Sequence, residues 1–168
     1  MSYLDSFKHA DDIVAHLDTV VPSIADPLLR AKYVGVVAVA AVTVYELSIK
    51  TVFVDFADRK HRVFGTFTDS HFNRINGRIS LKALKDEHIR LFGEKYLLRF
   101  KKKLGERSAM YLRLNRRDFR SSYGNIVSWR HSFAHQGKVS TTATYEEAVQ
   151  SYVDGKEVVH CLAESMVR

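Results

Sequence analysis

The chain has 168 residues, of which 46% are hydrophobic, so it has the ordinary size of one domain and enough apolar side chains for a core. Its 26 Lys and Arg exceed its 19 Asp and Glu, and the net charge of +7 favours an anionic partner such as RNA, DNA or an acidic protein. The one cysteine, Cys161, excludes an intramolecular disulfide framework and a thiolate-rich zinc site. We therefore expect a single domain over residues 1–168 in a reducing compartment.

Neither an export signal nor a membrane span is predicted. The N-terminal residues Met1 to Asp5 have no basic lead and no apolar run with a small-residue cleavage site. The most apolar stretch, Tyr33 to Tyr45, is bounded by charged residues and is shorter than the roughly 20 residues that a membrane span needs. These features predict a cytoplasmic protein with no membrane partner, in which this stretch is a buried helix.

The first helix is expected from about Ser2 to Thr19, because apolar residues recur there at helical spacing. The second is expected from Pro27 to about Asp58. Asp26 can cap the free amides at its start, and proline at the first helical position loses no needed hydrogen bond. Its apolar run has no turn signal over about 30 residues, which favours a helix over a strand. This should be the central helix of the molecule.

The middle of the chain is expected to hold a short helix and a longer one. Residues 58–69 are polar and turn-like. Ser70 and Ser80 are then the expected caps, the first for a short helix through Ile79 and the second for a longer helix that ends near Leu104.

Two further helices complete the expected fold. One runs from about Arg116 to Gln136 and ends at Gly137, a usual C-terminal cap. Thr144 and Glu147 then form a capping box for the last helix. The predicted fold class is therefore all-α, a single-domain bundle of about five helices.

The segment from Arg99 to Arg120 is the local source of the basic excess, since it contains only two acids, Glu106 and Asp118. Its cations could contact RNA phosphates without reading the base sequence. Equally, they could solvate a pair of helices or meet an acidic antitoxin. The candidate contacts to the RNA backbone are Lys101, Lys102, Lys103, Arg113, Arg116, Arg117 and Arg120.

The candidate chemistry lies on the helix before Gly137, in the segment Arg130-His131-Ser132-Phe133-Ala134-His135. On a helical wheel at about 100° per residue, both histidines face away from the aromatic core stripe. Arg130 lies on the flank of the helix, yet its long side chain can swing over the small Ala134 toward the imidazole of His135. The Arg and His side chains could therefore share one cleft.

This motif resembles the R-x4-6-H motif of HEPN domains, with Arg130, His131 and His135 matching it in order. The long second helix and the place of the motif near the end of the penultimate helix also resemble the HEPN bundle, particularly its RiboL-PSP-like branch. The resemblance implies a metal-independent endoribonuclease that needs no cofactor. It also implies a toxin or antiviral defence effector, in which two chains form a homodimer and bring their motifs together at a shared cleft.

The resemblance assigns roles to these side chains. His135 would be the general acid or base, because a His pKa near neutrality suits transfer of the 2′-hydroxyl or 5′-oxygen proton. Arg130 would clamp the phosphate and stabilise the extra negative charge of the transition state. His131 would orient the phosphate or its partner side chain. The expected partners are RNA, a second copy of the chain, and a cognate antitoxin or defence-system protein.

Several alternatives stay open. The Arg130–His135 face could simply be solvated, since basic residues near a helix C-terminus complement the helix dipole. Glu46 and Lys50 could point into the same cleft as supporting polar groups, or they could form an internal ion pair. Asn73 and Asn76 read as loop or cap residues, with a polar cluster beside a cleft as the alternative.

Two other functions also remain compatible with the sequence. One is a non-catalytic HEPN-like module that binds RNA or protein, and the other is an antitoxin that neutralises a toxin by complex formation. The branch that pairs with a nucleotidyltransferase extends its motif to His-x-Tyr, whereas here Gln136 and Gly137 follow His135. This departure argues against a target that an antitoxin adenylylates.

Overall fold

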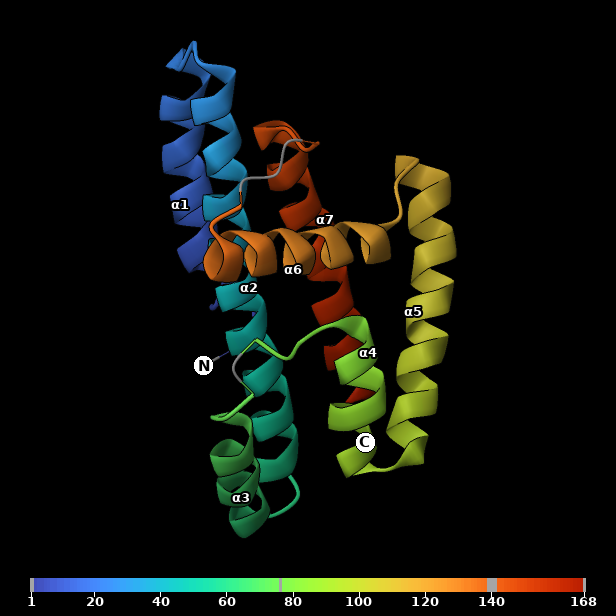
Figure 1. Cartoon of the computed structure of the whole chain (residues 1–168). Coiled ribbons are helices and arrows are strands. Elements are labelled where there is room, and N and C mark those ends of the chain that lie inside the picture. Colours follow the sequence, from blue (N-terminus) through green and yellow to red (C-terminus); the bar gives the residue numbers. More distant parts are fainter. Residues whose placement is uncertain (1, 76, 139–141, 168) are drawn as a thin grey trace.

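A computed structural model describes residues 2–75, 77–138 and 142–167 of the chain. The longest helix, α2 (Pro27–Asp58), runs along most of the molecule (Figure 1). It begins as predicted, because the Asp26 carboxylate accepts the Leu28 amide hydrogen bond at 2.9 Å and Pro27 occupies the first turn. By length and composition alone α2 could cross a membrane, but 56% of its most apolar window is buried inside the bundle. Such burial is typical of a core helix.

The other helices surround α2. It packs against α1 (Phe7–Val20), α3 (Arg62–Phe72), α6 (Phe119–Gln136) and α7 (Tyr145–Ser165), while α5 (Glu94–Asn115) packs on α7. Every regular element in the described part of the chain is helical, so the predicted all-α class is confirmed. The five long helices are α1, α2, α5, α6 and α7, and α3 and α4 (Leu81–Ala83) are shorter additions.

The centre of the core joins α2 to α6 and α7 through tyrosines. The rings of Tyr45 and Tyr123 stack with their centroids 5.1 Å apart. The Tyr45 hydroxyl donates a hydrogen bond to the backbone carbonyl of Tyr152 at 2.5 Å, so its polar end is satisfied inside the core. Gly155 makes room for this hydroxyl, since a Cβ there would lie 2.3 Å from it.

The predicted boundaries in the middle of the chain are wrong. Residues 62–72 form α3, which the side chain of His61 caps, so this helix neither begins at Ser70 nor continues to Ile79. Ser80 does cap the next helix, where its hydroxyl accepts the Ala83 amide at 3.1 Å. That helix does not run to Leu104, however. It continues as a π turn over residues 84–88 and a 3-10 turn over residues 89–92, and Gly93 then ends it.

Gly93 has a φ of 110°, a left-handed value that glycine adopts without a steric penalty, and the chain reverses there into α5 (Figure 1). The helix expected from Arg116 starts instead at Phe119. The backbone of Arg116 is in the left-handed conformation, with a φ of 58°, and ends α5 there. Asp118 then caps α6. The first helix also starts later than expected, at Phe7.

Two predicted caps at the C-terminal end of the chain are confirmed. Gly137 ends α6 in the left-handed conformation, with a φ of 63°. Thr144 and Glu147 form the reciprocal capping box of α7. Between these caps and the turn after α5, helix α6 crosses over α2 and α7. Its N-terminal end lies beside α5 and its C-terminal end beside α1 and α2 (Figure 1).

Candidate active site

The C-terminal half of α6 carries the predicted motif, and its packing decides which side chains remain accessible. The ring of Phe133 lies directly on Gly35 of α2. Arg130 is half-buried beside α2, whereas His131 and His135 are exposed. The aromatic residue thus anchors the helix while the basic side chains of the motif stay at the surface.

Arg130 and His135 meet as the sequence predicts. The Nη1 atom of Arg130 lies 2.9 Å from Nε2 of His135. Because a guanidinium has only donors, the imidazole nitrogen must accept, and we assign the proton of the neutral ring to Nδ1. The ring of His131 is the next neighbour, with its centroid 5.1 Å from that of His135. The three predicted catalytic side chains are therefore in one cluster.

The Arg130–His135 pair opens onto a pocket of about 450 Å³ between α6 and α2. Helix α2 contributes Thr43, Glu46 and Leu47 to its lining. The pocket therefore has a cation, an imidazole and a carboxylate around one opening. Such a set can hold a phosphate through the cation and move a proton through the imidazole.

The sequence leaves two alternatives for Glu46 and Lys50, an internal ion pair or polar groups that support the cleft. Glu46 makes two contacts that bear on this choice. Its Oε1 lies 3.3 Å from Nζ of Lys50, so the internal ion pair exists. Its Oε2 accepts a hydrogen bond from the Gly77 amide at 2.7 Å. Glu46 also lines the pocket, so it belongs both to the ion pair and to the cleft, whereas Lys50 is not among the residues that line the pocket.

Gly77 is a site residue that sequence reasoning missed. Its φ is 79°, and a Cβ built there would lie 3.4 Å from Nη1 of Arg130. The loop between α3 and α4 is thus tied by Glu46 against the guanidinium. A glycine that follows Asn76 signals a turn, but nothing local indicates which helix the turn contacts. Asn73 is the C-terminal cap of α3, and Asn76 lies outside the described residues.

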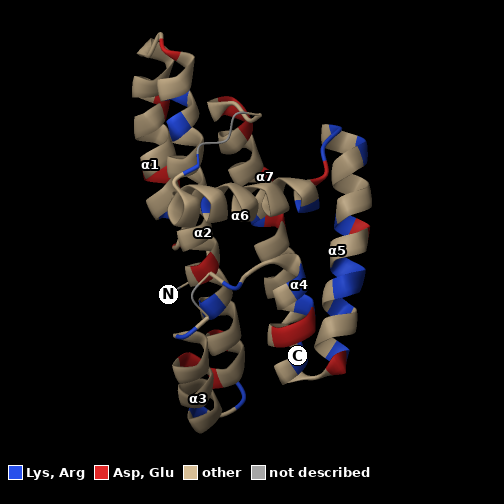
Figure 2. Cartoon of the chain, in the orientation of Figure 1, with Lys and Arg blue, Asp and Glu red and all other residues tan. Residues whose placement is uncertain are grey.

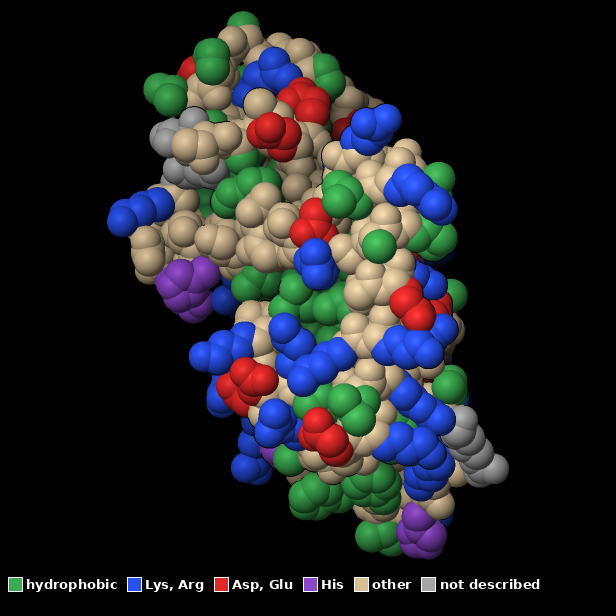
Figure 3. Space-filling view, turned by 90° about the vertical axis from the view of Figure 1, so that its right-hand side faces the viewer, with side chains coloured by type: hydrophobic (Ala, Val, Ile, Leu, Met, Phe, Trp, Pro, Cys, Tyr) green, Lys and Arg blue, Asp and Glu red, His purple; other side chains and the backbone are tan. Residues whose placement is uncertain are grey.

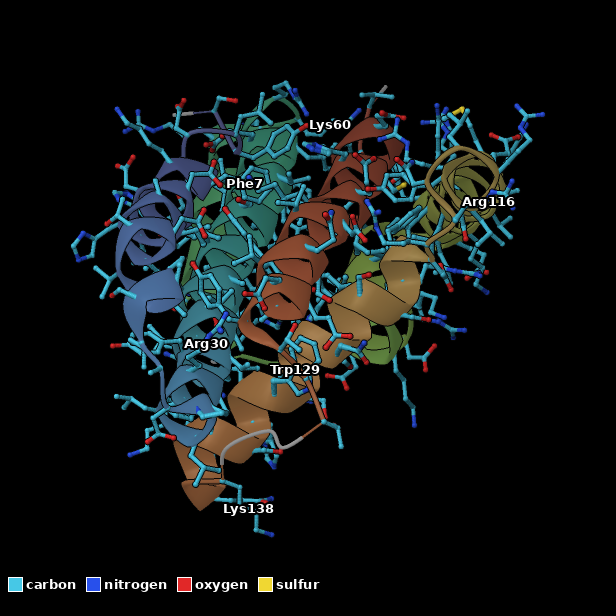
Figure 4. The ribbon with its side chains drawn as sticks, turned by 90° about the horizontal axis from the view of Figure 1, so that it is seen from above. Phe7, Arg30, Lys60, Arg116, Trp129 and Lys138 are labelled. Carbon is cyan, nitrogen blue, oxygen red and sulfur yellow. The ribbon has the colours of Figure 1, made fainter. Side chains whose placement is uncertain are left out.

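The basic segment lies away from this cluster. Figure 2 shows Lys and Arg concentrated along α5 and at the turn after it. Figure 4 places Arg116, in that turn, and Lys138, just after α6, at opposite ends of α6. The structure therefore does not bring the candidate RNA-backbone residues together with Arg130 and His135.

Several of these cations also have acidic partners. Figure 3 shows the face of α5, where acidic side chains lie among the basic ones. The ion pairs are Lys102–Glu106 at 3.8 Å, Lys103–Glu164 at 3.2 Å, Arg117–Asp154 at 2.9 Å and Arg120–Asp118 at 3.1 Å. Lys101, Arg113 and Arg116 are exposed. Contact of this segment with RNA stays a prediction, and these ion pairs are compatible with the alternative in which the cations solvate a pair of helices.

The fold and the cluster define an all-α protein with an Arg–His site at the end of one helix. The family model described as RiboL-PSP-HEPN matches residues 5–168, so the chain belongs to this family of the HEPN superfamily. A search of curated proteins and a search of solved structures each found no match. HEPN domains are often ribonucleases, and the family thereby indicates a nuclease-type or other RNA-related function.

Proposed function

We propose that this protein is a cytoplasmic endoribonuclease that cleaves RNA without a metal cofactor. The observation that carries the proposal is the 2.9 Å contact between Arg130 and His135 at the mouth of an accessible pocket. The pair supplies a phosphate-binding cation and a proton-transferring ring side by side, as this cleavage requires.

In the proposed reaction, an RNA phosphate draws the Arg130 guanidinium away from His135 and frees the Nε2 lone pair. This nitrogen accepts the proton of the ribose 2′-hydroxyl, and the 2′-oxygen forms a bond to phosphorus. The bond from phosphorus to the 5′-oxygen breaks, and that oxygen takes a proton from the His135 imidazolium, which returns to its neutral form. The products are a 2′,3′-cyclic phosphate, which can open to a 3′-phosphate, and a 5′-hydroxyl end. His131 orients the phosphate, and Glu46 holds the Gly77 loop against Arg130.

The test uses wild-type, Arg130→Ala and His135→Ala proteins with labelled structured and single-stranded RNAs in EDTA. We expect cleavage by the wild type alone, with 5′-hydroxyl ends, because loss of one transition-state donor typically costs about 10²–10³-fold in rate. Circular dichroism of all three proteins controls for folding. If all three bind RNA alike and none cuts, the non-catalytic binding module or the antitoxin replaces this proposal.

The active form is proposed to be a homodimer across the α2 face beside the pocket. Val36, Val39 and Leu47 follow one another along α2 and are 37%, 36% and 41% exposed. Val36 and Val39 also line an apolar groove of about 350 Å³, to which Ile13 and Phe133 contribute. Clustered exposed apolar side chains indicate an interaction surface. A second copy seated on this face would bring two Arg130–His135 pairs together at one cleft.

Val39→Glu tests the dimer, because a charge at the centre of this face opposes burial of that face. We expect the variant to sediment as a monomer and to lose cleavage while its helical content persists. Leu114→Glu is the matched control, since Leu114 is 68% exposed on α5 and away from this face. A wild-type protein that is monomeric and fully active would overturn the dimer.

The proposed biological setting is a toxin–antitoxin or phage-defence system, with a cognate antitoxin or defence protein as partner. Expression of the wild type should then arrest cell growth, and expression of His135→Ala should not. Arrest by both proteins would show that the effect does not depend on cleavage.

A further inference from the structure

A second pocket, of about 340 Å³, lies between α6 and α7. Trp129 and Asn125 of α6 form one side of it, and Glu147 and Gln150 of α7 form the other. Figure 4 shows Trp129 beside the N-terminal end of α7. The Arg130–His135 pocket faces α2, so the two pockets flank the same helix on different sides.

The floor of this pocket is the fully buried carboxylate of Asp154. It accepts hydrogen bonds from Tyr111 at 2.7 Å, from Arg117 at 2.9 Å and from Gln150 Nε2 at 2.8 Å, and Ser122 adds another at 3.2 Å. Burial would raise the pKa of Asp154, but the hydrogen bonds from Arg117, Tyr111 and Gln150 outweigh it and hold the pKa below its usual value. The floor is therefore charged, paired and fixed.

The fixed floor decides which atoms the pocket presents to a ligand. Gln150 directs its amide nitrogen to Asp154, so its amide oxygen is left as an acceptor. Glu147 uses Oε2 to accept the Thr144 amide hydrogen at 2.8 Å, and within the described residues its Oε1 accepts no hydrogen bond. The pocket thus combines a half-buried indole with acceptor oxygens. Arg117 also lines the pocket but donates two hydrogen bonds to Asp154, so the acceptor oxygens of Glu147 and Gln150 suit a flat ring that carries N–H donors.

We propose that this pocket binds a nucleobase with an exocyclic amino group, stacked beside Trp129 with its amino hydrogens toward Glu147 and Gln150. Adenine, guanine and cytosine have such a group and uracil does not, so uracil should bind worst. Aromatic side chains stack on any base, so the selectivity comes from the acceptor oxygens. In naming RNA as the source of the base, the inference rests on the proposed function. A helix is about 10 Å wide, so the base would belong to a nucleotide near the scissile phosphate.

The chain offers a built-in reporter, because Trp129 is its single tryptophan. The fluorescence of the His135→Ala protein, which should not cut, is titrated with oligoadenylate, oligocytidylate and oligouridylate. The same titration with AMP, CMP and UMP asks whether a free nucleotide suffices. We expect saturable changes in fluorescence, with binding about fivefold or more weaker for the uridine ligands. Tighter binding of the oligomers than of the mononucleotides would indicate that RNA is the ligand. Equal binding of both would indicate a free nucleotide.

Glu147→Gln in the His135→Ala background is the informative variant, because glutamine preserves the capping box while it removes the carboxylate. It should lose the preference for adenine and cytosine over uracil without a loss of helical content. Ser128→Ala is the control, since Ser128 is exposed next to Trp129 and does not line the pocket.

Unchanged fluorescence, or equal changes with uridine ligands, would overturn the inference. RNA cleavage by the wild type in that case would leave the proposed function standing. Selective fluorescence changes together with no cleavage would support the base pocket and refute the ribonuclease.

Discussion

Phe133 and Gly35 touch so closely that a Cβ at position 35 would lie 2.2 Å from two atoms of the Phe133 ring. This contact sets the distance between α6 and α2 at the end of α6 that carries the motif. The position of Arg130 beside Glu46 and Gly77 therefore depends on Gly35, which has no side chain. Any side chain at position 35 must push the motif away from α2.

Gly35→Ala should displace the Phe133 ring and destabilise the protein by about 1–3 kcal/mol, the usual cost of overpacking a core. Cleavage should fall as well, because the α6 end moves relative to Glu46. Urea unfolding and the RNA assay check the two effects. Gly124→Ala on α6, the helix that carries Phe133, is the control. A Cβ there meets nothing within 4 Å, and alanine should stabilise the helix by about 0.5–1 kcal/mol. Wild-type stability of Gly35→Ala would contradict this account.

Gly77→Ala should reduce cleavage by about tenfold or more, because a Cβ there would lie in van der Waals contact with the Arg130 guanidinium, 3.4 Å from Nη1, and would limit its movement toward the phosphate. The left-handed backbone adds a cost of about 1–2 kcal/mol in stability. Gly137→Ala separates the two effects, because Gly137 is also left-handed but a Cβ there meets nothing within 4 Å. It should lose a similar stability and retain most of the activity. Equal loss of activity in both variants would show that strain, and not the contact with Arg130, is responsible.

Asp154→Asn should destabilise the junction of α5, α6 and α7 by about 1.5–3 kcal/mol, the range for hydrogen bonds to a charged group. Because the folded pKa of Asp154 lies below its unfolded value, its ionisation stabilises the protein above the unfolded pKa, and this is lost as pH falls through the folded pKa. Below the unfolded pKa of Asp154, the thermal unfolding temperature of the wild type should therefore fall more steeply with decreasing pH than that of the variant. Identical pH profiles for the two proteins would rule out this role.

Mild acid should destabilise the protein through two histidines, the buried His88 and the half-buried His160. Burial lowers the pKa of His88 and of His160 below the ordinary value of 6.5. Their neutral forms stabilise the fold above that value, and this stability is lost as pH falls below 6.5 toward each folded pKa. His88 Nε2 also donates to the Arg78 carbonyl at 2.7 Å. Urea midpoints at about pH 7.5 and 5.5 should differ, with the lower midpoint in acid, and His160→Gln should reduce the difference.

The sequence by itself determined the features that depend on neighbours within one helical turn. The Asp26 cap, the Gly137 terminator and the Thr144–Glu147 box all follow from side chains that bond amides two or three residues away, or from one backbone conformation. The approach of Arg130 to His135, five residues further along the same helix, is also local, because a long arginine side chain can swing over the small Ala134 toward that imidazole.

Only the tertiary structure decided the rest of the site. Glu46 bonds the amide of Gly77, 31 residues away, and no periodicity along α2 indicates that partner. Asp154 likewise pairs with Arg117, which the sequence alone indicates only as a candidate contact to the RNA backbone. The break at Gly93 reflects the reversal that packs α5 on α7. These contacts join segments far apart in sequence, so packing of the whole core sets them, whereas local spacing cannot.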